Sequence, residues 1–486
     1  MEKKISKNYI YNLIYQILLV ISPVITIPFL SRSLGVEGIG QYSYAYAITS
    51  FFVLFASLGC DVYGRREISY LLNKPEERTM KFYSIQIIKV IFTLITMVVY
   101  IIYMLNSKNK ILLGLLIFHL INVPFNIGWF FQGIEEFKKI TLRGIVLKII
   151  DLFFVIFFIK KPSDLNIYVL GSSFISFIAF FVLWFDIKKY LVKVNIKKIK
   201  IKYDFKNCLI FFIPTVATTI YTLIDKTMLE LITKGYIANG YYEQTLKINI
   251  VLLRIVLALG LVLLPKISLA YQENKKEEIE KYIKLSMRYM FMISLAFAFG
   301  LFCISDIFVP WFFGSDFLEV ASLLKASGFI LVFQGINDVI GIQYMVSVGR
   351  QKEYIKSLGI GTIFNIIFNI FFIYKYNALG AIIASIIGEA TISVIQCYII
   401  RKEINLKDIF SSIEKYLFAS IIMSIILLIV KSRMSANILN TIILVFLGGG
   451  IYLTTLIFLK DKLIIYIIEK LKLVIINKFS KNEGKV

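Results

Sequence analysis

The sequence predicts an all-α integral membrane protein of about 14 transmembrane helices, in two pseudo-symmetric six-helix bundles around a central cavity plus two extra C-terminal helices. Composition, recurring apolar segments and an internal repeat predict this fold. Of the 486 residues, 58% are hydrophobic and 17% are charged. A soluble domain is nearer half apolar and a quarter charged. The composition therefore argues against a soluble enzyme, a coiled coil or a disordered chain.

Apolar segments long enough to cross a bilayer recur along the whole chain, since a membrane helix needs about 20 mostly apolar residues. They lie at 8–30, 41–63, 82–105, 111–132, 140–159, 166–187, 207–232, 241–264, 286–309, 319–347, 354–374, 378–400, 414–430 and 437–459. The first follows a few lysines and has no small-residue cleavage site, which predicts a retained helix rather than a signal peptide.

The formal net charge of +23 comes from 54 Lys and Arg against 31 Asp and Glu. These cations are concentrated in alternate loops, which is the pattern of membrane topology and not of nucleic-acid binding. With the N-terminus inside, most of the Lys and Arg residues outside the spans become cytoplasmic, including the lysine-rich run 188–206. The sequence therefore predicts a multi-pass protein of the bacterial cytoplasmic (inner or plasma) membrane with both termini cytoplasmic.

The same pattern divides the chain. We expect an N-terminal six-helix bundle at 1–187, a cytoplasmic basic linker at 188–206 and a C-terminal six-helix bundle at 207–401. Transmembrane helices 13 and 14 follow within 402–459. A basic amphipathic cytoplasmic tail at 460–486 is predicted to lie on anionic lipid.

Two groups of residues recur in the two bundles. Gly40-Gln41-Tyr42 opens the second apolar segment and Gly240-Tyr241-Tyr242 opens the eighth, and Leu58-Gly59 and Leu259-Gly260 follow them. The glycine-to-glycine spacings are 19 and 20 residues. An even number of helices per repeat gives both repeats the same orientation, related by an axis along the membrane normal. The repeat predicts a cavity between the bundles and alternating access by rocking.

Two runs carry a family resemblance. The first is the Pro–Ser-Arg-x-Leu-Gly–Gly-x-Gly-x-Tyr-Ser run within residues 28–43, and the second is Asp-Lys-Thr-Met-Leu at 225–229. With the fourteen-helix plan, they resemble the polysaccharide transporter (Wzx-type oligosaccharide flippase) family of the multidrug/oligosaccharidyl-lipid/polysaccharide exporter superfamily. One departure is Glu230, where a small residue is expected; the spacing predicts a pair with Lys226.

The resemblance implies a function and partners. It implies a flippase that moves undecaprenyl-diphosphate-linked oligosaccharide from the cytoplasmic to the outer leaflet, coupled to an ion gradient, for capsule, O-antigen or teichoic-acid-type export. The implied partners are this lipid-linked substrate, the bilayer, and a polysaccharide polymerase with its export machinery.

Cations inside membrane spans are costly and by default face a cavity or a partner. Because Arg and Lys bind phosphate oxygens, we expect a cationic cavity for the diphosphate. Its candidate substrate-binding residues are Arg254, Lys89, Lys247, Lys226, Arg32 and Lys148. Mutual neutralisation within Lys148–Asp151 and Lys226–Glu230 is the competing interpretation, because each pair lies one helical turn apart.

Carboxylates in the same spans are candidates for a coupling ion, H⁺ or Na⁺; structural hydrogen bonding is the alternative. These candidates are Asp225, Glu389, Asp151 and Asp338. No organic cofactor and no metal site are expected. The four cysteines are scattered singly through or beside apolar segments, which predicts small-hydrophobe packing rather than a metal site or a disulfide framework. There is no G-x-x-x-x-G-K-[ST] loop for ATP. The only histidine, His119, is predicted to be a satisfied buried side chain.

Three alternatives stay open. A MATE-like small-molecule/ion antiporter and a lipid II flippase have the same fold, and fold alone does not determine the substrate. A membrane glycosyltransferase or polymerase is of another class, but it needs a sizeable outer loop or clustered catalytic carboxylates. Neither is visible, so a non-enzymatic transporter is the favoured interpretation.

Overall fold

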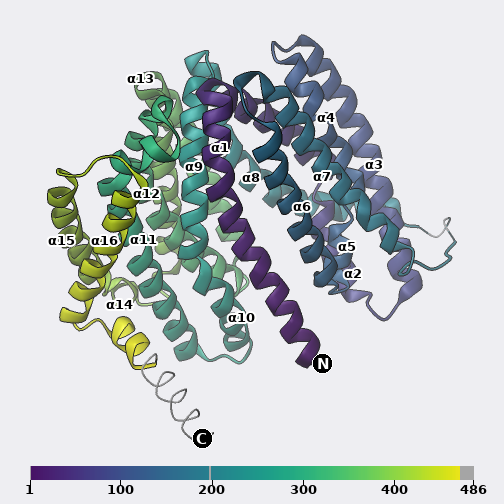
Figure 1. Cartoon of the computed structure of the whole chain (residues 1–486). Coiled ribbons are helices and arrows are strands. Elements are labelled where there is room, and N and C mark those ends of the chain that lie inside the picture. The colour runs from purple at the N-terminus through teal and green to yellow at the C-terminus, as the bar shows by residue number, and fades with distance from the viewer. Residues whose placement is uncertain (1, 196, 198, 471–486) are drawn as a thin grey trace, which may run out of the picture. The chain divides into compact units, whose positions relative to one another are not determined.

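The computed structural model describes residues 2–195, 197 and 199–470, apart from the side chains of 2–17, 19–20, 214, 217–218 and 221. Its described residues form helices and connecting turns, with no strand among them (Figure 1). Of the predicted basic tail, residues 462–470 are helical. The rest of that tail, 471–486, lies outside the described residues.

Nine helices in the described part of the chain are long and apolar enough to cross a membrane, or up to ten if a pair bent by 45° at Val256–Ala258 counts as one span. The all-α membrane fold is therefore confirmed, whereas the count of 14 is not. One reason is that some predicted loops are single-residue breaks. Helix α1 (Glu2–Ser57) contains two predicted segments, interrupted at Gly35 with φ 69°. Helix α13 (Gln351–Ile400) contains two more, interrupted at Asn377 with φ 50°. Gly and Asn tolerate such positive φ values.

The chain forms two compact units, Met1–Glu243 and Gln244–Val486. We call them unit 1 and unit 2 and describe each by itself. Unit 1 includes α8 (Ile201–Thr233) and the first part of α9 (Ile237–Val256), which the repeat groups with the C-terminal bundle. The bundle boundaries derived from the repeat stay a prediction. The connection between α7 (Leu165–Ile187) and α8 is shorter than the predicted linker, since residues 201–206 are already helical.

Unit 1 also contains α2 (Cys60–Tyr70), α3 (Pro75–Asn106), α4 (Lys110–Phe125), α5 (Gly128–Gly133) and α6 (Phe137–Phe158). Helices α3 and α4 lie side by side (Figure 1). One face of α3 exposes a row of large apolar side chains, including Leu94, Ile95 and Val98. A contiguous exposed apolar face of this kind is explained by contact with lipid.

Two short turns in unit 1 interrupt segments that the sequence predicts as continuous helices. Between α1 and α2, Leu58 and Gly59 have positive φ, and a side chain on Gly59 would lie 2.6 Å from the backbone of Phe212 on α8. Between α4 and α5, the Asn126 side chain accepts a hydrogen bond from the Gly128 backbone N–H at 3.1 Å. Each predicted continuous helix is thus interrupted by a local turn and then resumes.

Repeat-related glycines contact each other in unit 1. A Cβ on Gly40 would lie 1.8 Å from the carbonyl oxygen of Tyr236, and a Cβ on Gly240 would lie 2.2 Å from that of Val36. Each carbonyl belongs to the residue four positions before the opposite glycine, so the two contacts are reciprocal. This reciprocity supports the predicted duplication, and only glycine allows so close an approach.

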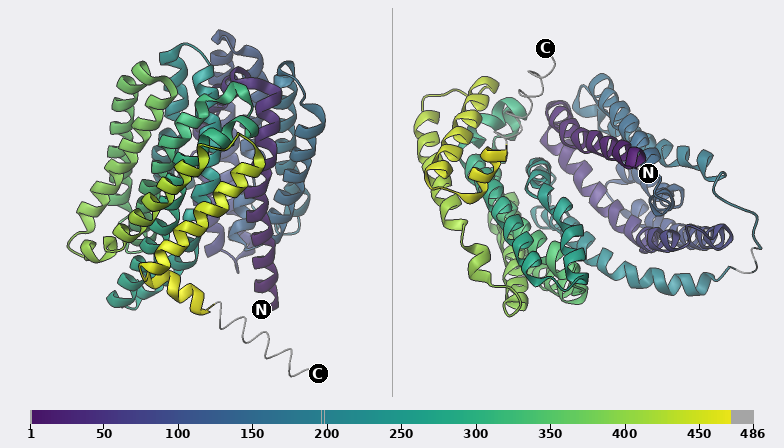
Figure 2. Two further views of the ribbon diagram at one scale, coloured as in Figure 1. Left: turned by 60° about the vertical axis from the view of Figure 1, so that its left-hand side comes forward. Right: turned by 90° about the horizontal axis from the view of Figure 1, so that it is seen from below.

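Unit 2 is arranged around α11 (Lys276–Phe312), which packs against α10 (Ala258–Gln272), α12 (Glu319–Asn337), α15 (Ile413–Lys431) and α16 (Ile438–Phe458). Helices α15 and α16 run beside each other (Figure 2). A π-helical segment, η4 (Asp338–Val346), continues α12, and α14 (Leu406–Phe410) follows α13. π-Helical turns are frequent at functional sites.

The cysteines are free thiols, and Cys60, Cys208 and Cys303 are fully buried. The sulfurs of Cys60 on α2 and Cys208 on α8 lie 3.4 Å apart. The expected packing role is thereby confirmed for these three, but the contact between two of them is not visible in the sequence spacing.

Candidate functional site

Unit 1 contains two adjoining cavities of about 340 and 390 Å³. Both are lined by Tyr46, His119, Ser176 and Phe180, so we treat them as two ends of one site, the unit 1 cavity. Helices α1, α4 and α7 supply these residues. A concave site of this size with a few polar groups among aromatic side chains is typical of ligand binding.

The first end is bordered by an ion pair. Lys89 on α3 has no exposed surface, and its ammonium lies 2.7 Å from Oδ1 of Asp61 on α2. It also donates to the backbone carbonyl of Asn126 at 2.8 Å. Asp61 and Asn126 line the cavity, whereas Lys89 lies behind them. In this structure Lys89 therefore neutralises and positions Asp61.

Asn122 lines the same end and is 5% exposed. Neither its side-chain nitrogen nor its side-chain oxygen has a hydrogen-bond partner among the described residues. Most buried polar side chains are hydrogen-bonded, and leaving one unsatisfied costs about 1–3 kcal/mol. Both atoms have almost no accessible surface, so the amide of Asn122 lies beneath the cavity surface with its hydrogen-bonding capacity unsatisfied.

Aromatic side chains form a wall along both ends. The ring centroids of Tyr42 and Tyr168 are 5.2 Å apart, and those of Tyr46 and His119 are 5.4 Å apart, each in edge-to-face geometry. His119 is half-buried and lines both cavities. The expectation of a satisfied buried histidine is corrected, because α4 presents this ring to the cavity, where it has an aromatic contact and no hydrogen bond to a described residue.

The second end is cationic. Arg143 donates to the carbonyl of Ala179 at 3.3 Å, and its guanidinium lies over the Phe180 ring, 5.1 Å from its centre. Lys148 lies 3.5 Å from Asp151 on the same helix, as the spacing predicted. Arg143, Lys148 and Asp151 all line this end. Two cations against one carboxylate favour an anionic group here.

Two other predicted residues of unit 1 lie near the start of α9. Lys226 pairs with Glu243 at 2.6 Å, which corrects the predicted pair with Glu230. Glu243 also accepts a hydrogen bond from Ser43 on α1 at 2.8 Å. The spacing along α8 does not decide the partner of Lys226, because the packing of α9 against α8 places the Glu243 carboxylate next to its ammonium. Asp225 is buried and accepts a hydrogen bond from the Tyr242 hydroxyl.

The remaining predicted cations line neither end of the unit 1 cavity. Arg32 on α1 is exposed, Lys247 on α9 is half-buried, and Arg254 further along α9 is exposed. Arg254 makes no ion pair within the described part of the chain. Lys325, a further intramembrane lysine, is paired with Asp306 at 2.6 Å.

The two predicted carboxylates of unit 2 are buried or half-buried and bonded to amides. Glu389 on α13 accepts from the side chains of Gln334, at 2.9 Å, and Asn337. Asp338, the first residue of η4, accepts from the Gln343 amide at 2.7 Å. Neutral amide donors stabilise a carboxylate without cancelling its charge.

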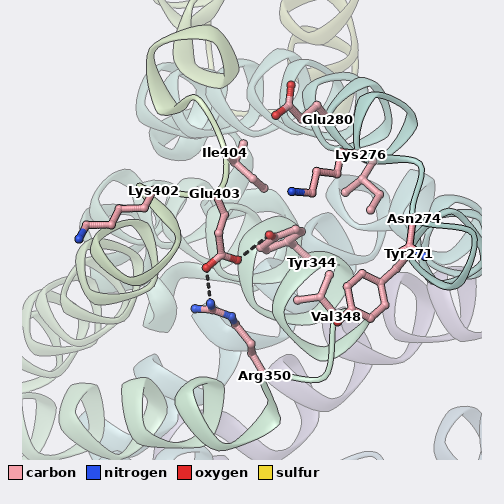
Figure 3. A pocket seen from close by; sticks show the side chains of 11 residues that line it. Tyr271, Asn274, Lys276, Glu280, Tyr344, Val348, Arg350, Lys402, Glu403 and Ile404 are labelled. Carbon is pink, nitrogen blue, oxygen red and sulfur yellow. Dashed lines mark hydrogen bonds and ion pairs between the residues drawn. The ribbon is translucent and has the colours of Figure 1, made fainter.

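Unit 2 also has a pocket of about 370 Å³ where several of its loops meet. Arg350 pairs with Glu403, which also accepts a hydrogen bond from the Tyr344 hydroxyl at 2.8 Å. Figure 3 shows both groups converging on Glu403, with the Lys276 side chain extending into the pocket and Lys402 pointing away from this pair. Glu403 and Arg350 are thus engaged with each other, whereas Lys276, Glu280 and Lys402 make no ion pair with another described residue.

Sequence reasoning missed Asp61, Asn122, Asn126 and Arg143. Arg143 lies near the start of the apolar segment 140–159, and the others adjoin helix breaks that apolarity alone does not reveal. A signal for Asn126 was present, because Pro124 and Asn126 together favour a helix end. Among the described residues no three His, Cys, Asp or Glu side chains are placed to hold a metal.

Comparison with known proteins supports the resemblance noted from the sequence. The model of the family described as "Polysaccharide biosynthesis protein" matches residues 5–270. The chain is 21% identical over 403 residues to a putative O-antigen transporter of Escherichia coli, covering 81% of this chain and 96% of that one.

Two solved structures share the fold. An inward closed lipid II flippase MurJ has a TM-score of 0.74 at 18% identity, with coverage of 94% and 99%. An inward-facing MATE transporter of the multidrug/oligosaccharidyl-lipid/polysaccharide superfamily has a TM-score of 0.63 at 15% identity, with coverage of 82% and 96%. Since the family model covers more than half of its length, this chain belongs to the polysaccharide biosynthesis protein family of membrane proteins.

Proposed function

We propose that this protein is a flippase that carries undecaprenyl-diphosphate-linked oligosaccharide from the cytoplasmic to the outer leaflet of the bacterial inner membrane. The observation that carries the proposal is the unit 1 cavity, which combines a cationic end with an end rich in hydroxyl and amide groups. A sugar diphosphate has the same two parts. The O-antigen transporter named among the relatives supports the substrate class.

Binding begins, in this proposal, with the diphosphate at Arg143 and Lys148. Their hydrogen bonds to phosphate oxygens are charge-assisted and hence about twice as strong as neutral ones. Asp151 limits the local excess of positive charge, which keeps binding reversible. The lipid tail stays in the bilayer, in keeping with the apolar outer faces of the helices. Alternating access then exposes the cargo to the other side, and no covalent step is required.

An ion gradient supplies the energy in this proposal. Asp225, Glu389, Asp151 and Asp338 are the candidate residues for a coupling H⁺ or Na⁺. The amide donors around Glu389 and Asp338 support this assignment, since a buried carboxylate held by neutral groups can still exchange a cation. Both termini are proposed to be cytoplasmic, on the distribution of Lys and Arg.

The test is transport in proteoliposomes. Undecaprenyl-diphosphate oligosaccharide is placed in both leaflets, and its protection from an added glycan-cleaving enzyme is followed with time. Wild type should remove this protection by exchanging the leaflets. Arg143→Gln with Lys148→Gln should slow exchange by roughly a hundredfold, since each lost charge-assisted bond is worth about 1.5–3 kcal/mol. Lys193→Gln, at an exposed linker lysine of the same unit, is the matched control.

The main rival is an antiporter of a small soluble compound, favoured by the fold shared with MATE transporters. If wild type moves no lipid, but an imposed proton or sodium gradient drives export of a small compound, the antiporter is the correct function. If the lipid moves at the same rate with and without both cations, the cationic end is not the diphosphate site.

A further inference from the structure

The start of α8 presents a cationic hollow on the surface of unit 1. Its volume is about 650 Å³, and its lining consists of Ile199, Lys200, Ile201, Lys202, Tyr203 and Lys206. This α8 hollow shares no residue with the unit 1 cavity. We propose that it binds the phosphate headgroup of an anionic phospholipid. The inference goes beyond the proposed function, because it does not depend on which compound the protein transports.

The charge of the α8 hollow is not neutralised by the protein. Its lining contains three exposed lysines and no carboxylate. Lys200, Lys202 and Lys206 make no ion pair with another residue in the described part of the chain. The one carboxylate within this stretch, Asp204, is buried and pairs instead with Lys81 at 2.6 Å. Three exposed cations at short spacing therefore remain to attract an anion.

The exposed face of α8 changes from charged to apolar along the helix. After Lys202 and Lys206, the same face continues with the large exposed side chains of Leu209, Ile210 and Ile213. Neighbours in this row are three or four residues apart, which places them on one side of the helix. An exposed apolar row is explained by contact with lipid tails. The lysines that precede it by about 6 Å along the axis therefore lie at the level of the headgroups.

Tyr203 supports this position and the choice of partner. Its side chain is 61% exposed, and tyrosine is enriched where a bilayer meets water. In the proposed topology this level belongs to the cytoplasmic leaflet, which carries anionic lipids. A phospholipid supplies both a phosphate for the lysines and acyl chains for the apolar row. A soluble nucleic acid or an acidic protein supplies only the negative charge.

The opposite face of the same helical turn is fixed inside unit 1. Asp204 accepts hydrogen bonds from the Tyr63 hydroxyl on α2 and the Lys81 ammonium on α3, both at 2.6 Å. Asp204 follows Lys202 by two residues, so the two side chains point to opposite sides of α8. The start of α8 is therefore anchored to two helices before any lipid binds. A headgroup meets a preformed surface, which lowers the entropic cost of binding.

The test measures phospholipid binding to the solubilised full chain. Its melting temperature is followed as phosphatidylglycerol replaces phosphatidylcholine in mixed micelles at constant total lipid, because a ligand that binds the folded state raises it. Each lysine near an anionic surface strengthens binding by about fivefold. The triple variant Lys200→Gln, Lys202→Gln, Lys206→Gln should therefore bind roughly a hundredfold more weakly. We expect it to show no increase at phosphatidylglycerol contents that saturate wild type.

The matched control is the triple variant Lys188→Gln, Lys193→Gln, Lys197→Gln. These lysines are exposed and belong to the same predicted linker, but they do not line the α8 hollow. The control removes the same charge and should keep the wild-type increase. An equal loss in both triple variants would show that only the total charge of the linker matters, and would overturn the site. Equal increases in all three proteins would also overturn it.

Two soluble anions separate a phospholipid from other partners. Glycerol 1-phosphate carries the phosphate without acyl chains, and an RNA oligonucleotide carries many phosphates. In phosphatidylcholine micelles, neither should raise the melting temperature as much as phosphatidylglycerol does. An equal increase with either anion would overturn the assignment to a lipid. None of these measurements requires transport, so their outcome stands whether or not the protein flips a lipid-linked oligosaccharide.

Discussion

The unit 1 cavity and the pocket of unit 2 have similar volumes, about 340–390 and 370 Å³, but different polar chemistry. In the unit 2 pocket, Glu403 already engages Arg350 and Tyr344. Among the residues lining the unit 1 cavity, Asn122 has both side-chain polar atoms buried without a hydrogen-bond partner among the described residues. Hydrogen bonds made within the protein stabilise the fold, whereas a buried polar group without a partner lowers the stability of the folded state. A ligand that hydrogen-bonds to such a group can restore the lost stability. The comparison supports the proposed ligand site in unit 1.

The same contrast separates the two sets of predicted ionisable residues. In unit 1, Lys89 and Lys148 each have a carboxylate that also faces the cavity. In unit 2, Glu389 is enclosed by amides from α12. Buried side-chain amides with an unpartnered atom are not confined to unit 1. The side-chain nitrogen of Asn365 on α13 also has no hydrogen-bond partner among the described residues. Asn365 does not line the pocket in Figure 3.

The largest effect should come from Lys89. Lys89→Leu leaves Asp61 without its cation, and breaking such a pair costs about 3 kcal/mol, at the lower end for buried pairs because Asp61 is partly exposed. Thermal unfolding in detergent measures this loss. The double variant Lys89→Leu with Asp61→Leu should regain most of the stability. A Lys89→Leu protein as stable as wild type would contradict the positioning role.

The next effect concerns the glycine contact of unit 1. Gly40→Ala or Gly240→Ala places a Cβ about 2 Å from a backbone carbonyl, so helices α1 and α9 must separate. We expect a loss of about 1–3 kcal/mol in the free energy of unfolding. Gly300→Ala in unit 2 is the matched control, because its Cβ meets no atom within 4 Å. There alanine should be neutral or stabilising by about 1 kcal/mol.

A transport effect is expected at Arg254. This exposed arginine makes no ion pair with the described carboxylates, so its charge is available to a phosphate. Arg254→Ala should slow lipid exchange by roughly tenfold and leave the melting temperature unchanged. Arg254→Lys should restore part of the rate. Loss of stability together with transport would instead indicate a structural arginine.

The smallest effect is expected in the unit 2 pocket. Arg350→Gln removes the partner of Glu403, and both side chains are about one-third exposed. Pairs of this exposure contribute about 0–1 kcal/mol. Chemical unfolding should register this loss, and lipid exchange should stay at the wild-type rate. A large loss of transport with unchanged stability would show that the unit 2 pocket also takes part, and would break the contrast between the units.

Several features were predictable because they depend on local sequence. The Lys148–Asp151 pair follows from the geometry of one helix. The family resemblance followed from the runs at 28–43 and 225–229, and the family match confirms it. The predicted pair of Lys226 with Glu230 was wrong, because a neighbouring helix supplies Glu243.

By itself the sequence determined the membrane environment, the helical class, the internal repeat and the supply of intramembrane charges. A run of about 20 apolar residues is enough to predict a membrane helix. In a bilayer the backbone N–H and C=O groups of the segment must form their hydrogen bonds within the helix. Only the tertiary structure decided which charges remain available. Asp61 and Lys89 are 28 residues apart and lie on different helices. Their contact, and the unsatisfied amide of Asn122 near it, lie beside helix breaks at Gly59 and Asn126 that no hydrophobic pattern encodes.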